Sequence, residues 1–595
     1  MTYQYFVNLV NVTEPVLKIE LITPKIDEET IIFRLPEMIP GTYRILDFGR
    51  YVNEVMAYDA QGNALTVTRL DTNSWQIDNA TSLYKLTYNG YPSFNDTLPN
   101  NYVYPMGGTN IEPGKNYVLN NHGFFGYFDG YLAREYALNI TKPSDFYGST
   151  SLTKTVSEPN LDVIIAPNYQ FLVDNPIMYN KPDTTSIYFP ECRVLISAYS
   201  PGGGIKAADL KDELDDLLTA HRNFYGGTLP ADRYSFIFYF AAKPNKFGIA
   251  GALEHNLSSF YYFPDAPAAQ KKMVLGYLGD MSSHEFYHII TPLNLHAEQI
   301  ANFDFNNPQM SEHLWLYEGV TEYNSHYIQL YEDLIDLKDY VGDVEQKLEQ
   351  SKQYNDTLAF TEMSKNVLTT YKKEYQNVYQ KGALIGLCLD ILIRSESNGE
   401  QGLQDVINSL MAKYGKDTPF KDEELFAEIT QRTSPAVGEF LNTYVGGNNK
   451  LPYKDIFSKI GLKYTATPYE VVDAGGFNLG FNESTFRFII IALDEENEFI
   501  KNLGLQAGDE LYSVNGDVIN FMNIREKLAP KGNKQKIGDK YEVEVYRKNS
   551  EGKFELIKAS TTISKLKTMY DEKVEIMDNI TPEQEKIRNA WMGKN

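Results

Sequence analysis

The spacing of apolar residues changes twice along this chain of 595 residues. From residue 1 to about 175, short runs such as "VLKIELITP" and "SLYKLTYNG" alternate apolar with polar residues between turns rich in Gly, Pro, Asn and Asp. Helical spacing begins near 207 and dominates from 266 to about 460, and short strands return between about 465 and 565. Alternation indicates antiparallel strands and the longer period indicates helices, so the chain combines the two in separate regions.

We therefore predict a multi-domain α+β protein, because a chain of this length exceeds what a single hydrophobic core supports. The predicted parts are an N-terminal antiparallel β domain, a mostly helical domain, a small C-terminal β domain and a charged tail, over residues 1–175, 176–462, 463–566 and 567–595.

The net charge of −24 excludes one class of partner. An acidic chain repels phosphate backbones and anionic lipid, so we expect no nucleic acid and no membrane among its partners. No apolar run is long enough for a membrane helix, and Cys192 and Cys388 lie in apolar runs typical of buried thiols.

Two cellular locations are compatible with the start of the sequence. No basic segment followed by an apolar stretch begins the chain, which predicts a soluble cytoplasmic protein if the chain is complete. Met1 is followed almost directly by the strand-like "YQYFVNLVNV", as it would be in a periplasmic or exported protein whose signal peptide had been removed.

The pentapeptide "HEFYH" predicts a metal site on a helix. His284 and His288 are four residues apart and so share one helix face, with Glu285 beside them. We expect this helix to have Asp265 and Pro267 in its first turn and to end at Pro292.

A third ligand is expected because catalytic zinc sites have three protein ligands and leave the fourth position to water. The candidate is Glu318 in "LWLYEGVTEYN", on a second predicted helix. Glu322 lies one turn farther on, where its carboxylate could accept the free N–H of a ligating histidine. The sequence thus predicts one zinc ion per chain.

These residues resemble the glycyl aminopeptidase family, which comprises gluzincin zinc peptidases with a thermolysin-like catalytic domain and a PDZ domain. Besides "HEFYH" and "EGVTE", the stretch "GALEH" (251–255) is similar to the family's G-x-L-E-H strand, and "YQKG" (379–382) to its Y-x-K-G motif. The segment "PEMIPGTYR" (36–44) resembles its P-G-[ST]-Y segment. One departure is "IITPLNLHAEQI" (289–300), where the family often has a W-N-V-K-R-type sequence.

The resemblance implies hydrolysis of peptides by zinc-activated water. Glu285 would act as general base and then acid, and the hydroxyl of Tyr379 would stabilise the oxyanion with zinc. Tyr371 or Tyr375 could replace Tyr379, which could instead be an ordinary packing residue.

The same resemblance places the substrate's amino terminus. Glu254 would pair with its α-ammonium and make the enzyme an aminopeptidase for small residues such as Gly or Ala. The backbone at Gly251 and Ala252 could bind an extended peptide as an added strand. Alternatively, Glu254 is an exposed strand residue without this role.

The segment "LGLQAGDELYSVNGDVI" (503–519) resembles a PDZ domain, with turns at 507–509 and 515–516. "GGFNLGF" (475–481) is similar to the loop with which such domains bind a peptide or a chain terminus. A module used only for packing is the alternative.

Two other functions stay open at this point. One is a zinc endopeptidase, or another hydrolase on the same scaffold, in which Glu254 has another purpose. The other is a non-catalytic PDZ-type binding protein with structural zinc, although structural zinc normally has four protein ligands.

Overall fold

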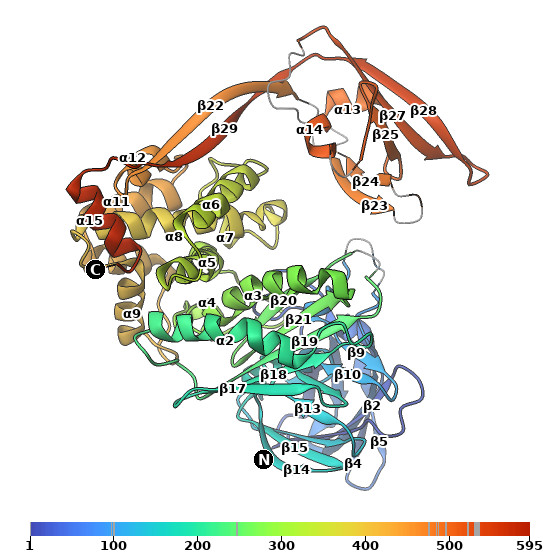
Figure 1. Cartoon of the computed structure of the whole chain (residues 1–595). Helices are drawn as coiled ribbons and strands as arrows, with labels where there is room; N and C mark the ends of the chain where they lie inside the picture. The colour runs from blue at the N-terminus through green and yellow to red at the C-terminus, as the bar shows by residue number, and fades with distance from the viewer. Residues whose placement is uncertain are drawn as a thin grey trace. The chain divides into compact units, whose positions relative to one another are not determined.

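The computed structural model describes residues 2–96, 98, 101–245, 248–473, 477–482, 485, 487–493, 497–520, 523–528 and 536–594. Their contacts form two compact units, Met1–Gly461 with Asp578–Asn595, and Leu462–Met577. The chain is a multi-domain α+β protein with an N-terminal β-rich part, a helical middle part and C-terminal β sheets (Figure 1). The boundary at 175 stays a prediction, because both sides of it belong to one unit.

Three sheets make up the N-terminal part. The largest contains, in spatial order, β14 (Thr153–Glu158), β15 (Leu161–Ala166), β12 (Tyr136–Thr141), β1 (Tyr3–Asn8), β2 (Leu17–Ile22), β8 (Leu83–Gly90), β4 (Val52–Asp59) and β5 (Ala64–Leu65). The two smaller sheets are β13 (Tyr147–Ser149), β16 (Ile177–Asn180), β10 (Asn116–Leu119) and β9 (Asn110–Glu112), and β11 (Tyr127–Phe128), β3 (Thr30–Arg34), β7 (Ser74–Asp78) and β6 (Val67–Arg69).

The predicted alternation is clear in β1, where Tyr3, Tyr5 and Val7 are buried and the residues between them are exposed. Among the described strands of these sheets, the pairings are antiparallel except that of β1 with β12.

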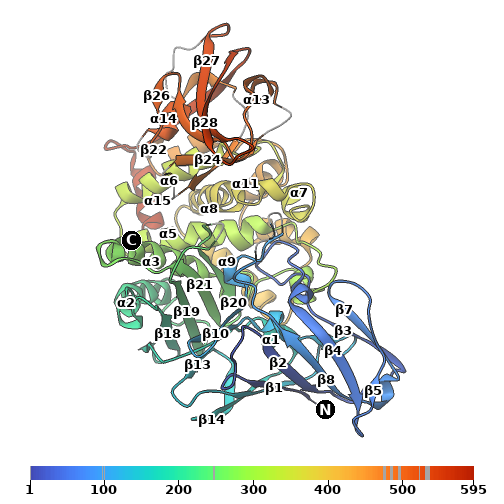
Figure 2. The same ribbon diagram turned by 90° about the vertical axis from the view of Figure 1, so that its right-hand side faces the viewer.

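A mixed five-stranded sheet is formed by strands between residues 184 and 264. Its order is β17 (Thr184–Tyr188), β18 (Arg193–Tyr199), β19 (Arg233–Ala241), β21 (Ser258–Pro264) and β20 (Gly251–His255). Helices α2 (Ala207–Phe224) and α3 (Lys271–Tyr287) lie along one face of it (Figures 1 and 2). On the other face, Ile237 and Tyr262 pack with Phe94 and Val118. Because both faces are covered, β19 is apolar along almost its whole length and shows no alternation.

The rest of this unit is helical. The helices are α1 (Tyr169–Val173), α4 (Glu298–Ala301), the π-helix η6 (Trp315–Val320), α5 (Thr321–Tyr331), α6 (Leu337–Ser351), α7 (Phe360–Lys365), α8 (Asn377–Glu396), α9 (Leu403–Lys413), α10 (Leu425–Arg432), α11 (Pro435–Phe440) and α12 (Tyr453–Ser458). Helix α8 is buried on nearly all sides, which explains its apolar sequence "GALIGLCLDILI". None of the helices in the described ranges has the length and apolar character of a membrane span.

The predicted tail is ordered. Its first part belongs to β29 (Leu566–Ile576), and residues 582–591 form α15 (Pro582–Trp591). Ile587, Ala590 and Trp591 share one side of α15 and are buried, although the segment as a whole is charged. The indole N–H of Trp591 donates to the hydroxyl of Tyr323 at 3.1 Å, so α15 is packed against the helical part of the chain.

The C-terminal unit is built from strands. A long ribbon pairs β22 (Leu462–Val472) with β29, and a sheet contains β23 (Phe477–Asn482), β24 (Arg487–Leu493), β25 (Glu510–Val514), β26 (Asp517–Val518), β27 (Lys540–Lys548) and β28 (Phe554–Thr562), together with α13 (Glu498–Leu503) and α14 (Ile524–Leu528). The predicted turn at Asn515 and Gly516 joins β25 to β26, and both residues have positive φ. Part of the predicted binding loop, residues 475 and 476, lies outside the described residues.

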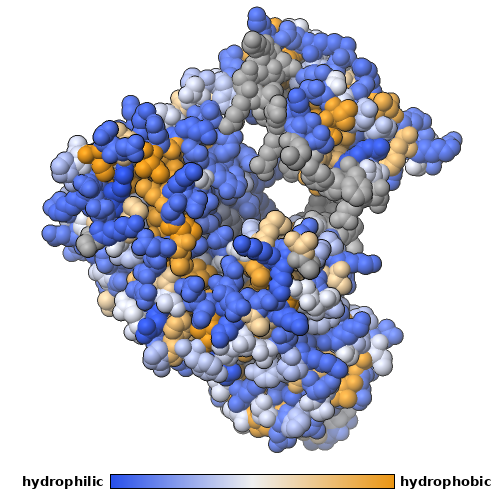
Figure 3. Space-filling view, viewed as in Figure 1, coloured by the Kyte–Doolittle hydropathy of each residue, from blue (hydrophilic) through white to orange (hydrophobic). Residues whose placement is uncertain are grey.

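Hydrophilic residues cover most of the face shown in Figure 3, as expected for a chain with a net charge of −24. Apolar side chains are instead gathered in the interior of each unit.

Candidate metal and catalytic site

The two histidines of "HEFYH" lie together at the end of α3. This helix begins at Lys271, because a 3₁₀ turn, Ala268–Gln270, occupies the first turn that the sequence predicted, and it ends at Tyr287. His288 is therefore the first residue after the helix and still has helical dihedrals. The Nε2 atoms of His284 and His288 are 3.2 Å apart, and both side chains are buried.

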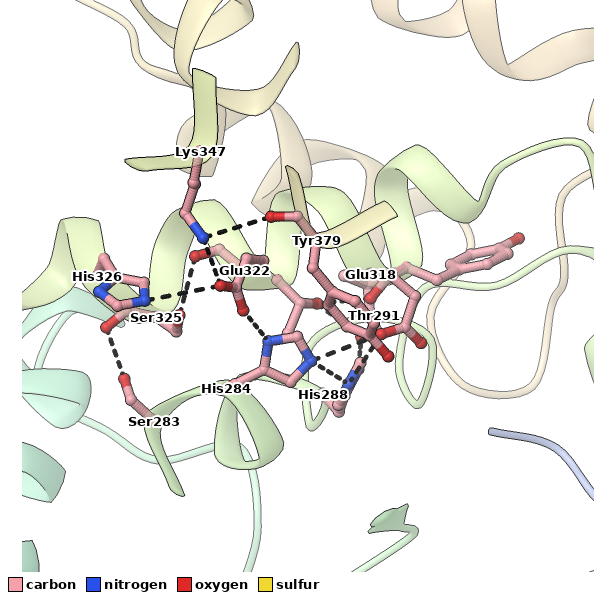
Figure 4. A network of polar contacts seen from close by, with 12 residues as sticks. Ser283, His284, His288, Thr291, Glu318, Glu322, Ser325, His326, Lys347 and Tyr379 are labelled. Carbon is pink, nitrogen blue, oxygen red and sulfur yellow. Dashed lines mark hydrogen bonds and ion pairs between the residues drawn. The ribbon is translucent and has the colours of Figure 1, made fainter. Parts of the chain in front are cut away.

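Glu318 lies beside the two histidines. Its Oε2 atom lies 3.5 Å from Nε2 of His284 and 3.8 Å from Nε2 of His288. Figure 4 shows the side chains of His284, His288 and Glu318 directed toward one another. One possible ligand atom from each lies within 4.8 Å of the others. Two imidazoles and one carboxylate arranged in this way match the protein ligands of a catalytic metal site.

The position of Glu318 depends on two glycines. Glu318 lies in the π-helix η6, whereas the sequence suggested an ordinary α-helix. Gly319 is packed against α8, where a Cβ atom added to it would lie 2.6 Å from the carbonyl carbon of Gly382. The glycines of "EGVTE" and "YQKG" thus allow two helix backbones to touch, which brings Tyr379 close to Glu318.

Two hydrogen bonds orient the histidine rings. Nδ1 of His284 donates to Oε2 of Glu322 at 2.7 Å, and Nδ1 of His288 donates to the carbonyl of Thr291 at 3.0 Å. These two bonds favour the tautomer with the proton on Nδ1, which leaves the lone pair of each Nε2 atom available to a metal ion. The first bond is the one predicted for Glu322, whereas no sequence pattern pointed to Thr291.

Lys347 completes this arrangement from α6, and no sequence pattern pointed to it. Its ammonium donates to Oε1 of Glu322 at 2.5 Å. Burial alone would raise the pKa of Glu322, but Lys347 and hydrogen bonds with His284 and His326 hold it well below its ordinary value. This lowered pKa favours the ionised form of Glu322, which accepts the hydrogen bond from His284.

Glu285 has the environment of a proton carrier. Its side chain is buried, and its Oε2 atom has no hydrogen-bond partner among the described residues. Burial raises the pKa of Glu285 to about 8, His284 opposes the rise, and the charges of Glu318 and Glu322 add to it. Such a group can both accept and release a proton near neutral pH.

Glu254 belongs to the same site. It lies on β20, at the edge of the five-stranded sheet, and its carboxylate is within 4.8 Å of possible ligand atoms of Glu285 and His288. Desolvation raises the pKa of Glu254 well above its ordinary value, and the charges of Glu318 and Glu285 raise it further. A cation next to Glu254 would relieve this repulsion.

The other two residues predicted on this strand are Gly251 and Ala252, and both are part of β20. A Cβ atom on Gly251 would lie 2.9 Å from Cε of Met106 in the N-terminal part. The missing side chain at this position therefore makes room for Met106.

A cavity of about 380 Å³ adjoins Glu254. Pro292, Leu293 and His296 also line it, and they belong to the segment that departs from the family pattern. This segment and Glu254 thus line the same cavity.

Tyr379 reaches the site from α8. Its ring centroid is 5.6 Å from that of His284, and its hydroxyl is hydrogen-bonded to that of Tyr375 at 2.8 Å. Burial and the charge of Glu318 raise the pKa of Tyr379 well above its ordinary value, so the hydroxyl keeps its proton and can donate it in a hydrogen bond.

Two protein-family models match the chain. The model described as the Peptidase M61 N-terminal domain matches residues 4–181, and the model described as M61 glycyl aminopeptidase matches residues 278–385. A search of curated proteins finds no match.

A solved structure shows the same fold. An aminopeptidase N family protein from Idiomarina loihiensis is 17% identical, with a TM-score of 0.79 over 99% of this chain and 100% of that one. An M1 zinc metallopeptidase from Deinococcus radiodurans, bound to a Tyr-Ser-Ala substrate, is 14% identical, with a TM-score of 0.46 over 76% of this chain and 95% of that one. The family matches include both the strands of the N-terminal part and the helices that carry His284, His288, Glu318 and Tyr379. The chain belongs to the glycyl aminopeptidase family and is a metallopeptidase.

Proposed function

We propose that the protein is a zinc aminopeptidase that removes small residues, Gly or Ala, from the amino terminus of peptides. In this proposal the part that carries the site is a thermolysin-like catalytic domain, and His284, His288 and Glu318 hold one zinc ion per chain. The donor set supports zinc, since imidazole and carboxylate ligands with one open position are typical of its catalytic sites. When bound, zinc would supply a Lewis acid for the peptide carbonyl and for a water molecule.

Glu285 is proposed as the general base and then acid. Its unpartnered Oε2 atom is free to take a proton from water, and its pKa of about 8 suits the return of that proton to the leaving amine. The proposed role of Tyr379 is to donate a hydrogen bond to the oxyanion that forms when the carbonyl is attacked.

The observation that carries the aminopeptidase proposal is the distance between Glu254 and the other catalytic groups. Its carboxylate is within 4.8 Å of Glu285 and His288. One residue of extended chain spans about 3.5 Å, so an α-ammonium held by Glu254 leaves room for a single residue before the scissile bond. β20 is also an edge strand of its sheet, the position at which an extended peptide can add as a further strand beside Gly251 and Ala252.

The test compares peptides with a free N-terminal glycine and their acetylated counterparts. Acetylation removes the charge that pairs with Glu254, and we expect a loss of about 2–5 kcal/mol by analogy with broken buried ion pairs. This loss corresponds to a decrease in kcat/KM of roughly 30- to several-thousand-fold. Glu254→Ala should erase most of the difference, whereas Glu298→Ala, a change at an exposed carboxylate on α4, should preserve it.

Comparable rates on free and acetylated peptides, or internal cleavage of a protein substrate, would contradict this proposal and favour the endopeptidase. Retention of zinc without hydrolysis of any tested peptide would also contradict the proposed substrate class.

We further propose that the C-terminal unit is a PDZ-like module that binds a peptide or a chain terminus. The turn between β25 and β26, and the sheet that contains them, support this assignment. A fluorescent peptide library tested against the wild type would measure such binding, and a chain that retains no peptide would leave packing as the role of the module.

A further inference from the structure

We propose that Tyr43, contributed by the N-terminal β part of the chain, is a positioning residue for the metal ligand Glu318. The inference rests on the proposed function, because it assigns Glu318 to zinc. Tyr43 lies in the segment between β3 and the 3₁₀ helix η1 (Phe48–Tyr51), far from Glu318 in sequence. Its hydroxyl donates to Oε1 of Glu318 at 2.8 Å.

This hydrogen bond selects one orientation of the carboxylate. With Oε1 bound to Tyr43, the other oxygen, Oε2, is the one that faces Nε2 of His284 and His288, at 3.5 and 3.8 Å. Each candidate ligand then has a partner that holds it, since Glu322 holds His284 and the carbonyl of Thr291 holds His288. The partners of the two histidines come from the helical part, whereas Tyr43 comes from the N-terminal part.

The segment around Tyr43 is held in an unusual conformation. Tyr43 has a φ of 45°, in the left-handed region that tyrosine rarely adopts, and Gly41 has a φ of 81°. A Cβ atom at Gly41 would lie 2.5 Å from Oε1 of Glu254, so the segment packs directly on the proposed amine-binding residue. Strain of this kind persists where the surroundings hold the residue in place, as they do here beside the site.

Tyr43 also contacts the proposed oxyanion donor through one intermediate. Its ring centroid is 5.1 Å from that of Tyr375, and the hydroxyl of Tyr375 is hydrogen-bonded to that of Tyr379 at 2.8 Å. A single segment of the N-terminal part therefore touches Glu254 and Glu318 directly and Tyr379 through Tyr375. The site is completed only when the N-terminal part is docked.

The chain offers a matched control in Tyr127. Its hydroxyl donates to Oδ1 of Asn306 at 2.7 Å and so joins the same two parts of the chain, but at a different place. Tyr127→Phe and Tyr43→Phe each remove one such bond and keep the ring. Only Tyr43→Phe removes a contact with a proposed ligand.

The experiment measures zinc affinity of the metal-free proteins by competition with a chromophoric chelator. We expect Tyr43→Phe to bind zinc about 10- to 100-fold more weakly than the wild type, as is usual when the partner of a metal ligand is lost. Tyr127→Phe should bind within about twofold of the wild type, because its hydroxyl supports no ligand. The two metal-free variants should retain the wild-type circular dichroism spectrum and unfold at similar temperatures.

Wild-type affinity in Tyr43→Phe would overturn the inference alone. Unfolding of metal-free Tyr43→Phe under conditions where Tyr127→Phe is folded would also overturn it, by assigning Tyr43 a role in folding. A wild-type chain without zinc affinity would instead overturn the proposed function, and this inference with it.

Discussion

Replacing Gly319 by alanine tests whether close contact of two helices positions the catalytic groups. The new Cβ atom would lie 2.6 Å from the carbonyl carbon of Gly382 and 2.7 Å from its Cα and oxygen atoms. Ordinary contacts between carbon atoms are about 3.5–4.0 Å, so the helices must separate by about 1 Å. Because the opposing atoms belong to the backbone, no side-chain rotation can relieve the overlap.

We expect Gly319→Ala to cost about 1–3 kcal/mol in free energy of unfolding, the usual range for overpacking. The value of kcat should also fall, because a shift of about 1 Å between Glu318 on η6 and Tyr379 on α8 can reduce it by roughly 10²-fold. The assays are urea unfolding of the metal-free protein and kcat on a free glycyl peptide.

Gly276→Ala is the matched control. Gly276 lies on α3, the helix that carries His284, and a Cβ atom there would meet no atom within 4 Å. This substitution should leave kcat unchanged and stabilise the protein by up to about 1 kcal/mol, the difference in helix propensity. Wild-type stability and kcat in Gly319→Ala would refute the argument from helix contact.

Three further results are expected. Glu285→Gln should bind zinc as the wild type does but lose turnover, as measured by elemental analysis and a peptide assay, because it keeps the proposed ligands and removes the proposed general base. Tyr379→Phe should lower kcat by about 10²–10³-fold if its hydroxyl stabilises the oxyanion, and an unchanged kcat would transfer that role to Tyr375. Burial lowers the pKa of His122 to about 3. Between about pH 6.5 and pH 3 the unfolded chain therefore binds a proton at this residue that the folded chain does not. As the pH is lowered through this range, His122 should decrease the free energy of unfolding by on the order of 1.4 kcal/mol per pH unit. In urea unfolding between about pH 6 and pH 4, His122→Gln should show a shallower fall than the wild type.

The histidine pair could be predicted from the sequence because its geometry is local. Residues four apart on a helix share a face whatever surrounds them, and His284 and His288 do so although the helix ends at Tyr287. The meeting of this pair with Glu318 does not follow from spacing alone, and the prediction rested on the motif. The π-helical geometry around Glu318 was not predictable, because it accompanies tertiary contact between Gly319 and Gly382.

Some residues at the site could not be predicted from the sequence, because their roles depend on contacts between distant segments. Lys347 and Tyr43 are single polar residues in ordinary surroundings, and each has a partner at the site only after distant elements pack together. Alternation failed as a signal for β19 because both of its faces are buried. The charge of residues 582–591 concealed the buried side of α15, which is short and contains Ile587 and Trp591.

The most direct test of the account is a crystallographic anomalous difference map recorded at the zinc absorption edge. One peak per chain is expected, about 2.0–2.2 Å from Nε2 of His284, Nε2 of His288 and an oxygen of Glu318, with a fourth position not filled by protein. No peak among these residues, or a peak enclosed by four protein ligands, would contradict a catalytic zinc at this site.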